Sequence, residues 1–433
     1  MKTTIKTTRR QFIGQTSALC AVSMFAAPGL LRAQNLNSKL NVACIGVCAQ
    51  GNYSVQNVKE ENIVALCDVD GARAKKCFES FPEAKKFADF RKMFDDLDGK
   101  IDAVTVATPD HTHAAASVAA MNRGIHCYCE KPLAHDAGEV RKMMETAKAK
   151  KLQTQMGTQI HAENNYRRVV EIIQAGVIGK ITEVSVWVGG KGWGGRPIPP
   201  GTFEIPATLD WDLWLGPAAE RPYNPCYVPG GWRAYWAFGN GVLGDMACHY
   251  MDLPYWALGL RSPKTIEAAG KPADPECCPL DLTVRYEFPK TEKHDAVTLT
   301  WYDTSLRPPV LKEKGMRQWG KGVLFTGTEG FLEADYSGYH LYPEEKFRDF
   351  KRPEETIPPS PGHHKEWLNA VRNGGTTSCN FDYSGTLTEA VLLGTVAYRT
   401  GRKLTWDAAA FQTDVPEANA LLHAERRKGW ELG

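Results

Sequence analysis

Residues 38–160 alternate between short apolar segments and helical segments, and this alternation constrains the fold more than any other feature. The apolar segments span residues 40–47, 62–68, 101–108 and 125–129. Continuous apolar runs of this length are typical of strands buried on both faces of a parallel sheet. The sequence therefore predicts an N-terminal α/β domain with a parallel sheet, over residues 38–155.

The first predicted strand leads into the turn of NVACIGVCAQG, residues 41–51, which is typical of a dinucleotide-binding Rossmann unit except at its middle position. Gly46 and Gly51 hold the first and third glycine positions, for the tight turn and for close packing of helix on strand. Cys48 holds the second, where a glycine lets the backbone approach a pyrophosphate. Cysteine is small, so we expect a narrowed cofactor site that is still open.

An acid ends the second predicted strand. Asp68 follows Gly46 by 22 residues, where a carboxylate hydrogen-bonds a ribose hydroxyl and repels a 2′-phosphate. This position favours NAD, with NADP the less favoured cofactor. On the incomplete glycine motif alone, a Rossmann-shaped domain that binds no cofactor is as good an interpretation as one that binds NAD.

Residues 1–33 have the composition of an export signal. Arg9 and Arg10 precede Phe12 and a moderately apolar run, and small residues surround a cleavage position after Ala33. The run is too short for a stable membrane span, and the arginine pair resembles the twin-arginine signal for folded proteins. We expect a periplasmic or otherwise exported protein without an integral membrane segment in the mature chain.

The composition of the remaining chain excludes several classes of partner. Residues 1–33 contain five of the 52 lysines and arginines and none of the 50 acids, so the rest of the chain carries slightly more acids than bases. No nucleic-acid partner is therefore indicated. Eleven of the 12 cysteines lie beyond residue 33, in spacings that match no disulfide or zinc pattern, so we expect buried free thiols. The length predicts a second domain, residues 156–433.

The spacing of three residues in the segment 245–252 indicates acid–base chemistry. Asp245, His249 and Asp252 are spaced i, i+4 and i+7, so on a helix they would share one face. A histidine beside a carboxylate is suited to alcohol oxidation, because a base must take the hydroxyl proton while hydride leaves for nicotinamide. The alternative is a pair of solvated or capping acids beside a core histidine.

Lys131 and two histidines follow predicted strands. Lys131 comes directly after the strand that ends at Cys129, and open α/β sheets bind ligands at the carboxyl ends of their strands. His111 and His113 follow the strand that ends at Thr108. With no third ligand nearby in sequence we predict no metal; we expect His113 to line the cofactor or substrate cleft and His111 to cap a helix.

Several motifs together resemble the Gfo/Idh/MocA family, named for glucose-fructose oxidoreductase, inositol dehydrogenase and rhizopine catabolism. They are ATPDHTH at residues 107–113, EKP at 130–132, LDWDLWLGP at 209–217, GVLGDMACHYMD at 241–252 and HHKEWL at 363–368. The resemblance implies an N-terminal Rossmann domain and a C-terminal α/β domain with an open, mainly antiparallel sheet. Residues 180–188, 281–288 and 296–302 fit strands of that sheet, and a helix ending near Arg402 would return to the Rossmann domain.

The resemblance also implies roles for individual residues. Asp245 and His249 would be the substrate-binding acid and the general acid/base, and Lys131 would bond the substrate hydroxyl. The cofactor would be bound by residues of the glycine turn and of the strand ends, namely Gly46, Cys48, Gly51, Asp68, Thr108, Pro109, His113, Glu130 and Lys131. Substrate contacts would come from Trp232, Arg233, Trp236 and Asp252.

Tryptophans suggest the kind of substrate. The chain has 12, several of them between residues 187 and 256, and aromatic faces stack on sugar rings, although tryptophan is also an ordinary core and interface residue. We therefore expect a small carbohydrate substrate, and the family resemblance implies a homo-oligomer. The glycine- and proline-rich residues 189–200 would be a loop over the cleft or an arm that packs on a neighbouring subunit.

Export limits the mechanism, because free nicotinamide cofactors belong to the cytoplasm. We expect an oxidoreductase that binds NAD tightly and acts on a CH–OH group, for example by oxidising C3 of a sugar to a ketone. A redox-neutral glycosidase, in which a transient ketone enables elimination and water addition, is the first alternative. A cofactor-free sugar-binding protein is the second, and Cys48 is its best support.

Overall fold

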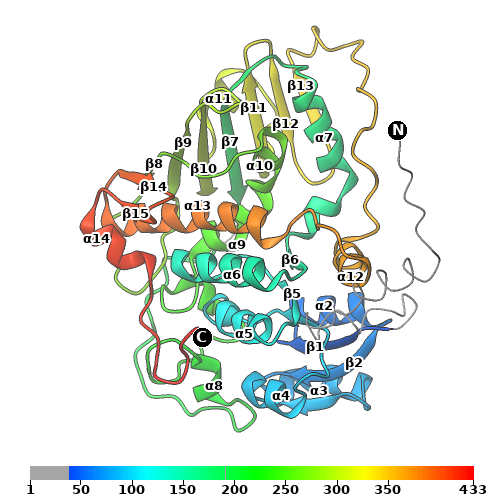
Figure 1. Ribbon diagram of the computed structural model, residues 1–433. Helices are drawn as coiled ribbons and strands as arrows, with labels where there is room; N and C mark the ends of the chain where they lie inside the picture. Colours follow the sequence, from blue (N-terminus) through cyan, green and yellow to red (C-terminus); the bar gives the residue numbers. More distant parts are fainter. Residues whose placement is uncertain (1–38, 191) are drawn as a thin grey trace, which may run out of the picture. The chain divides into compact units, whose positions relative to one another are not determined.

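The computed structural model describes residues 39–190 and 192–433, whose strands form two sheets (Figure 1). The first sheet is parallel, in the order β3-β2-β1-β4-β5-β6. Its strands are β1 (Asn41–Ile45), β2 (Asn62–Cys67), β3 (Lys85–Phe87), β4 (Ala103–Val106), β5 (His126–Cys129) and β6 (Thr154–Met156). The order reverses between β1 and β4, as in a dinucleotide-binding Rossmann fold, where ligands bind at this switch point. The prediction of the first sheet is confirmed.

Helices follow the strands of this sheet as the sequence predicts. They are α2 (Gln50–Val58), α3 (Gly71–Ser80), α4 (Phe90–Asp96), α5 (Asp110–Asn122) and α6 (Ala137–Lys150). Side chains of Asp70, Asp89 and Asp136 accept hydrogen bonds from the first turns of α3, α4 and α6, which stabilises those helix starts. The late helix α12 (His363–Asn373) packs on α2, β5 and β6.

The second sheet is mainly antiparallel, in the order β13-β12-β11-β7-β10-β9-β8-β14-β15, with β7 and β10 parallel. Its strands are β7 (Ile181–Gly189), β8 (Thr265–Ala269), β9 (Thr283–Phe288), β10 (Val297–Thr304), β11 (Lys321–Gly327), β12 (Phe331–Ala334), β13 (Tyr339–Tyr342), β14 (Leu404–Asp407) and β15 (Gln412–Thr413). On β10, buried residues alternate with half-buried ones, as expected for a sheet with one covered face. The three predicted strands are confirmed as β7, β9 and β10.

Helices of the second half cover this sheet and continue toward the first. They are η2 (Gln159–Ala162), α7 (Asn164–Gln174), α8 (Trp211–Leu215), η3 (Gly231–Ala234), α9 (Gly241–Tyr250), α10 (Asp252–Leu258), α11 (Pro309–Glu313), α13 (Phe381–Thr400), α14 (Pro416–Asn419) and η4 (Ala420–Leu422). The largest hydrophobic cluster runs through residues of both sheets. The two halves therefore share one core.

The long helix α13 joins the halves, and two of its glycines permit the close packing. A Cβ at Gly385 would lie 2.4 Å from the sulfur of Met144 on α6, and one at Gly394 would lie 2.3 Å from the hydroxyl of Tyr286 on β9. The helix lies beside α6 between the two sheets (Figure 1). An alanine at Gly394 would therefore displace the buried Tyr286, whereas one at Gly385 would displace the flexible Met144 side chain.

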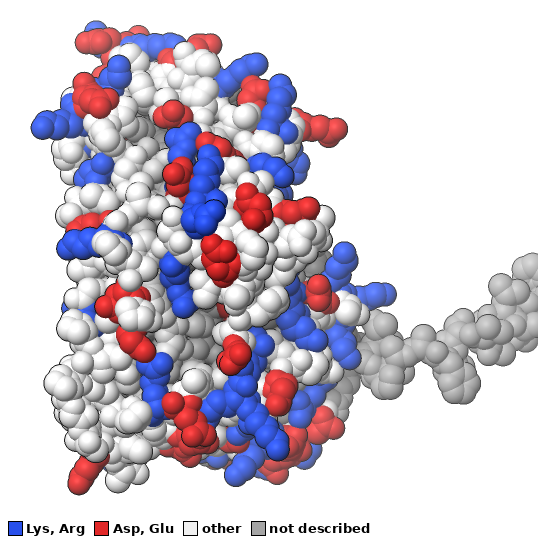
Figure 2. Space-filling model, turned by 90° about the vertical axis from the view of Figure 1, so that its left-hand side faces the viewer, with Lys and Arg blue, Asp and Glu red and all other residues white. Residues whose placement is uncertain are grey.

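The surface agrees with the near-neutral composition. On the face shown in Figure 2, basic and acidic side chains are interspersed, and no large area carries a single sign. Within the described residues, no helix combines the length and the apolar character needed to cross a bilayer. The eleven cysteines from Cys44 to Cys379 are free thiols, and most are buried, as predicted.

Candidate active site

A cleft of about 460 Å³ lies where the carboxyl ends of β1, β2, β4 and β5 meet α9 and η3. It brings together most residues predicted from the sequence. Those lining it are Gly46, Cys48, Asp68, Thr108, Pro109, Glu130, Lys131, Trp232, Arg233, Asp245 and His249. The cofactor motif of the first half and the acid–base motif of the second therefore share one cavity.

The glycine turn between β1 and α2 has the geometry that a dinucleotide requires. Gly46 has φ +73°, and a Cβ there would lie 2.6 Å from the carbonyl oxygen of Ala107. A Cβ at Gly51 would lie 1.9 Å from the carbonyl oxygen of Gly46. No hydrogen bond within the described residues engages the backbone N–H groups of Ala49 and Gln50, which line the cleft at the start of α2. Such a helix start binds phosphate groups.

Cys48 is compatible with a pyrophosphate at this turn. Its thiol donates a hydrogen bond to Asp68 Oδ2 at 3.3 Å. Burial, and then the nearby Asp68 carboxylate, raise the pKa of Cys48 to about 12. At neutral pH the thiol therefore carries no negative charge that would repel a phosphate group.

Asp68 is held at the end of β2 by the glycine turn. Its Oδ2 accepts from the backbone N–H of Val47 at 3.0 Å, and its Oδ1 accepts from that of Asp70 at 3.0 Å. These bonds fix the carboxylate at the edge of the cleft and leave it further lone pairs for a ribose hydroxyl. The residues present therefore fit a bound dinucleotide.

The centre of the cleft is an ion-pair cluster around Asp245 on α9. Lys131 Nζ lies 2.8 Å from Asp245 Oδ1, and Arg233 Nε lies 3.1 Å from the same oxygen. The indole N–H of Trp193 donates to Asp245 Oδ2 at 2.8 Å. Three donors thus fix one carboxylate, whose side chain is 10 % exposed.

The charges in this cluster stabilise one another. Burial would raise the pKa of Asp245, but Lys131 and Arg233 outweigh it and hold that pKa well below its ordinary value. Burial would lower the pKa of Lys131, but the Asp245 carboxylate raises it above its ordinary value. Lys131 is therefore an ammonium group that can donate a hydrogen bond but cannot act as a base.

Glu130 is the other titratable group beside Lys131. Its Oε1 accepts from Gln159 Nε2 at 2.8 Å and from Gln50 Nε2 at 3.2 Å. Burial raises the pKa of Glu130 to about 7. A Cβ at Gly157 would lie 2.6 Å from its carboxyl group, so the glycine after β6 makes room for this side chain.

Asp110, at the start of α5, lines the cleft and was not predicted as a site residue. It is 4 % exposed, and burial raises its pKa to about 8, although Arg233 and Lys131 oppose this shift. The signal was present, because Asp110 lies inside the motif 107–113. Gln159 and Trp193 were missed as well, although Gln159 follows β6 and Trp193 lies in the glycine-rich loop.

Asp110 gives the folded protein a pH-dependent stability. The folded state keeps this carboxyl protonated up to about pH 8, whereas the unfolded chain ionises it near its ordinary pKa of 3.8. The free energy of unfolding should therefore fall as the pH rises through this window. Urea unfolding at about pH 5 and about pH 8 should show a smaller fall for Asp110→Asn than for wild type. An equal fall in both proteins would contradict the assignment.

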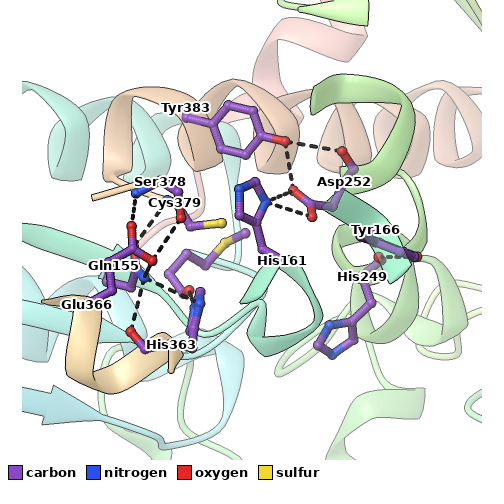
Figure 3. A network of polar contacts seen from close by, with 11 residues as sticks. Gln155, His161, Tyr166, His249, Asp252, His363, Glu366, Ser378, Cys379 and Tyr383 are labelled. Carbon is purple, nitrogen blue, oxygen red and sulfur yellow. Dashed lines mark hydrogen bonds and ion pairs between the residues drawn. The ribbon is translucent and has the colours of Figure 1, made fainter. Parts of the chain in front are cut away.

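The structure corrects the predicted face formed by Asp245, His249 and Asp252. Helix α9 ends at Tyr250, and Asp252 begins α10. Asp252 is fully buried, 2.9 Å from His161 Nδ1 and 2.7 Å from the hydroxyl of Tyr383. Figure 3 shows the His249 ring pointing away from this network. Asp252 is therefore not among the residues lining the cleft.

Two further predictions need correction. Trp236 is buried with its indole N–H bonded to the carbonyl oxygen of Asp274 at 2.9 Å, away from the cleft. His113 is 1 % exposed and lies between the carbonyl oxygens of Pro132 and Thr108, so it supports the two strand ends instead of lining the cleft. His111 does not cap its own helix α5; its Nε2 instead contacts the carbonyl oxygen of Trp214 in the last turn of α8 at 3.0 Å.

One group among the described residues has the atoms to hold a metal ion. Donor atoms of His161, Asp252 and Cys379 lie within 4.8 Å of one another. The Asp252 carboxylate already accepts from Tyr383 and contacts His161. Burial raises the pKa of Cys379 well above its ordinary value, which disfavours the thiolate that a metal requires. We interpret the group as a structural hydrogen-bond network.

Solved structures of known proteins share the fold. A WlbA dehydrogenase from Bordetella pertussis, in complex with NADH and UDP-GlcNAcA, aligns with a TM-score of 0.61 at 16% identity, covering 85% of this chain and 99% of that one. An aldose-aldose oxidoreductase from Caulobacter crescentus aligns with a TM-score of 0.57 at 15% identity, covering 85% and 100%. At these identities the likeness concerns the fold alone.

Curated relatives match over part of their length. Inositol 2-dehydrogenase of Salmonella typhimurium is 31% identical over 120 residues, which are 27% of this chain and 35% of the relative. Levoglucosan dehydrogenase of Pseudarthrobacter phenanthrenivorans is 30% identical over 180 residues, 40% of this chain and 36% of the relative. The matched stretches thus span about a third of each relative.

Two family models match consecutive parts of the chain. The NAD-binding Rossmann fold of the oxidoreductase family matches residues 40–158. The C-terminal alpha/beta domain of the same family matches residues 163–291. Together they cover more than half of the sequence, and they meet at the cleft described above. The chain belongs to the Gfo/Idh/MocA oxidoreductase family.

Proposed function

We propose that the protein is an NAD-dependent oxidoreductase acting on a CH–OH group of a carbohydrate. The observation that carries this is the single cleft shared by the glycine turn, the Lys131–Asp245 ion pair and His249. A hydride acceptor and a proton acceptor are the two groups that alcohol oxidation needs. Trp193 and Trp232 line the same cleft, and the names of two relatives, inositol and levoglucosan dehydrogenases, support a polyol or sugar.

The residues divide the reaction between them. Bound NAD would accept the hydride from the carbon that carries the hydroxyl. The Lys131 ammonium donates a hydrogen bond to that hydroxyl oxygen and stabilises the negative charge that develops on it. Asp245 holds Lys131 in place. His249 takes the hydroxyl proton, because Lys131 is already protonated.

A panel of polyols, sugars and glycosides tests this function. Purified protein with added NAD is mixed with each compound while absorbance of reduced nicotinamide and released free sugar are both recorded. A lasting absorbance rise supports the oxidoreductase. Sugar release without a net rise would instead show the redox-neutral glycosidase, and binding of a sugar without either signal would show a binding protein.

Asp68 supports NAD over NADP. Asp68→Ala should weaken NAD binding by about tenfold or more, since a hydrogen bond to a charged group contributes about 1.5–3 kcal/mol. It should also raise the affinity for NADP relative to that for NAD, because the negative charge that would face a 2′-phosphate is removed. Titration of both cofactors measures this. Asp102→Ala is the matched control, since its carboxylate bonds Asn41 at the start of β1.

An unchanged preference for NAD over NADP in Asp68→Ala would contradict the ribose assignment.

The proposed location is the periplasm or another exported compartment, reached through the twin-arginine route. Residues 1–33, which would carry this signal, lie outside the described residues, and fractionation of producing cells tests the proposal. We also propose a homo-oligomer, which light scattering of the purified protein tests.

A further inference from the structure

A segment from the second half of the chain covers the end of the cleft where Asp68 lies. We call residues 206–216, which include α8, the strap. The carbonyl oxygen of Thr208 accepts from the backbone N–H of Gly71 at 2.9 Å, and the N–H of Asp210 donates to the carbonyl oxygen of Val69 at 2.9 Å. The strap is thus bonded to the turn between β2 and α3.

The inner side of the strap forms part of the cleft wall. Leu209, Leu213 and Trp214 line the cavity together with Asp68. Since an acid at the end of β2 marks the ribose position, the adenosine part of a dinucleotide would lie under these side chains. His111 on α5 contacts the carbonyl oxygen of Trp214 at 3.0 Å and anchors the strap from the opposite side.

Arg427, near the C-terminus, holds the strap from outside. Its Nη2 donates to the carbonyl oxygen of Asp212 at 2.8 Å, and its Nε donates to that of Gly216 at 2.8 Å. Its Nη1 also lies 2.5 Å from Asp212 Oδ1. The Arg427 side chain is 13 % exposed and that of Asp212 is 73 % exposed, so the bonds to Asp212 are open to water, whereas the bond to Gly216 is half-buried.

The tail that carries Arg427 is itself fixed to the Rossmann domain. The Trp430 ring lies 4.0 Å from the Arg91 guanidinium and 5.8 Å from the Phe90 ring, both at the start of α4. Phe90 also lines the cleft. The tail therefore connects the strap to the domain that would hold the cofactor.

We infer that Arg427 is a positioning residue that keeps the strap closed over the adenosine end of the cleft and slows the release of NAD. The inference rests on the proposed function. In this inference a dinucleotide leaves the cleft beneath the strap, and opening the strap breaks the Arg427 bonds to Asp212 and Gly216 as well as the backbone bonds of Thr208 and Asp210. Charge-assisted bonds to two carbonyl oxygens and a carboxylate oppose that opening.

The test is the dissociation rate of NADH from the full-length protein, followed by fluorescence after mixing with excess NAD. Arg427→Met keeps an apolar stem but removes all three bonds, and it should release NADH at least tenfold faster. Asp212→Asn keeps both carbonyl acceptors and should have a smaller effect. Arg402→Met is the matched control, because Arg402 pairs with Glu417 at an exposed site.

Equal dissociation rates in Arg427→Met and wild type would overturn the inference. If that variant does not fold, hydrogen exchange of the wild-type protein decides instead. The N–H groups of Asp210 and Gly216 should exchange more slowly with NAD bound than without it, and unchanged exchange would overturn the inference. Failure of wild-type protein to bind NADH at all would refute the proposed function, which separates the two failures.

Discussion

Lys131→Met is expected to lower kcat by about 10²- to 10³-fold, the range typical of losing one donor to a developing negative charge, while NAD still binds. The variant keeps the length of the side chain and removes the ammonium that faces Asp245 at 2.8 Å. Without it, the developing charge on the substrate oxygen has no donor at this position. Steady-state kinetics and NAD titration measure the two effects separately.

The control for this variant is Lys290→Met. Lys290 pairs with Asp295, and its side chain is 70 % exposed, so the same chemical change there should leave kcat at the wild-type value. A Lys131→Met protein with wild-type kcat would show that Lys131 has only a structural role. Weakened NAD binding with unchanged kcat would place Lys131 in the cofactor site alone.

Asp245→Asn is expected to lower the free energy of unfolding by about 3–5 kcal/mol, as when one partner of a buried ion pair is removed. The amide leaves Lys131 and Arg233, whose side chains are 12 % and 27 % exposed, without their shared carboxylate. Because the pKa of Asp245 is lowered, its contribution is present above its ordinary pKa of 3.8 and is lost as the pH falls through the lower value of the folded state.

Urea unfolding at neutral pH measures the effect, and Glu417→Gln is the control. Glu417 and Arg402 are 57 % and 61 % exposed, so breaking that pair should change stability by less than about 1 kcal/mol. Equal losses of unfolding free energy in the two variants would contradict the conclusion that burial makes the Asp245 ion pairs contribute more to stability than an exposed pair.

The sequence predicted the Rossmann half well because its signals are local. Apolar strands, the turn at Gly46 and the acid at Asp68 all lie within one stretch of chain. Strands β7, β9 and β10 were predicted as strands of the C-terminal sheet that the family resemblance implies. The alternation of buried and exposed positions along a strand does not depend on distant residues.

The errors came from long-range packing. Spacing alone placed Asp252 beside His249, but the break after α9 and the contacts from His161 and Tyr383 bury it elsewhere. Trp236 lies close in sequence to the motif at residues 241–252, but its indole N–H bonds the carbonyl oxygen of Asp274. Most of the strap belongs to the motif at residues 209–217, yet its position over Asp68 depends on bonds to Gly71 and Val69 that no spacing reveals.

The most direct measurement of the central claim is the amount of NAD(H) bound to the full-length protein. Purified protein is denatured and the supernatant assayed; protein found empty is then titrated with NAD. We expect one equivalent of NAD(H) per chain, either carried through purification or taken up in the titration. A protein that neither releases NAD nor takes it up would contradict this claim. It would mean that the turn containing Cys48 no longer serves a redox enzyme.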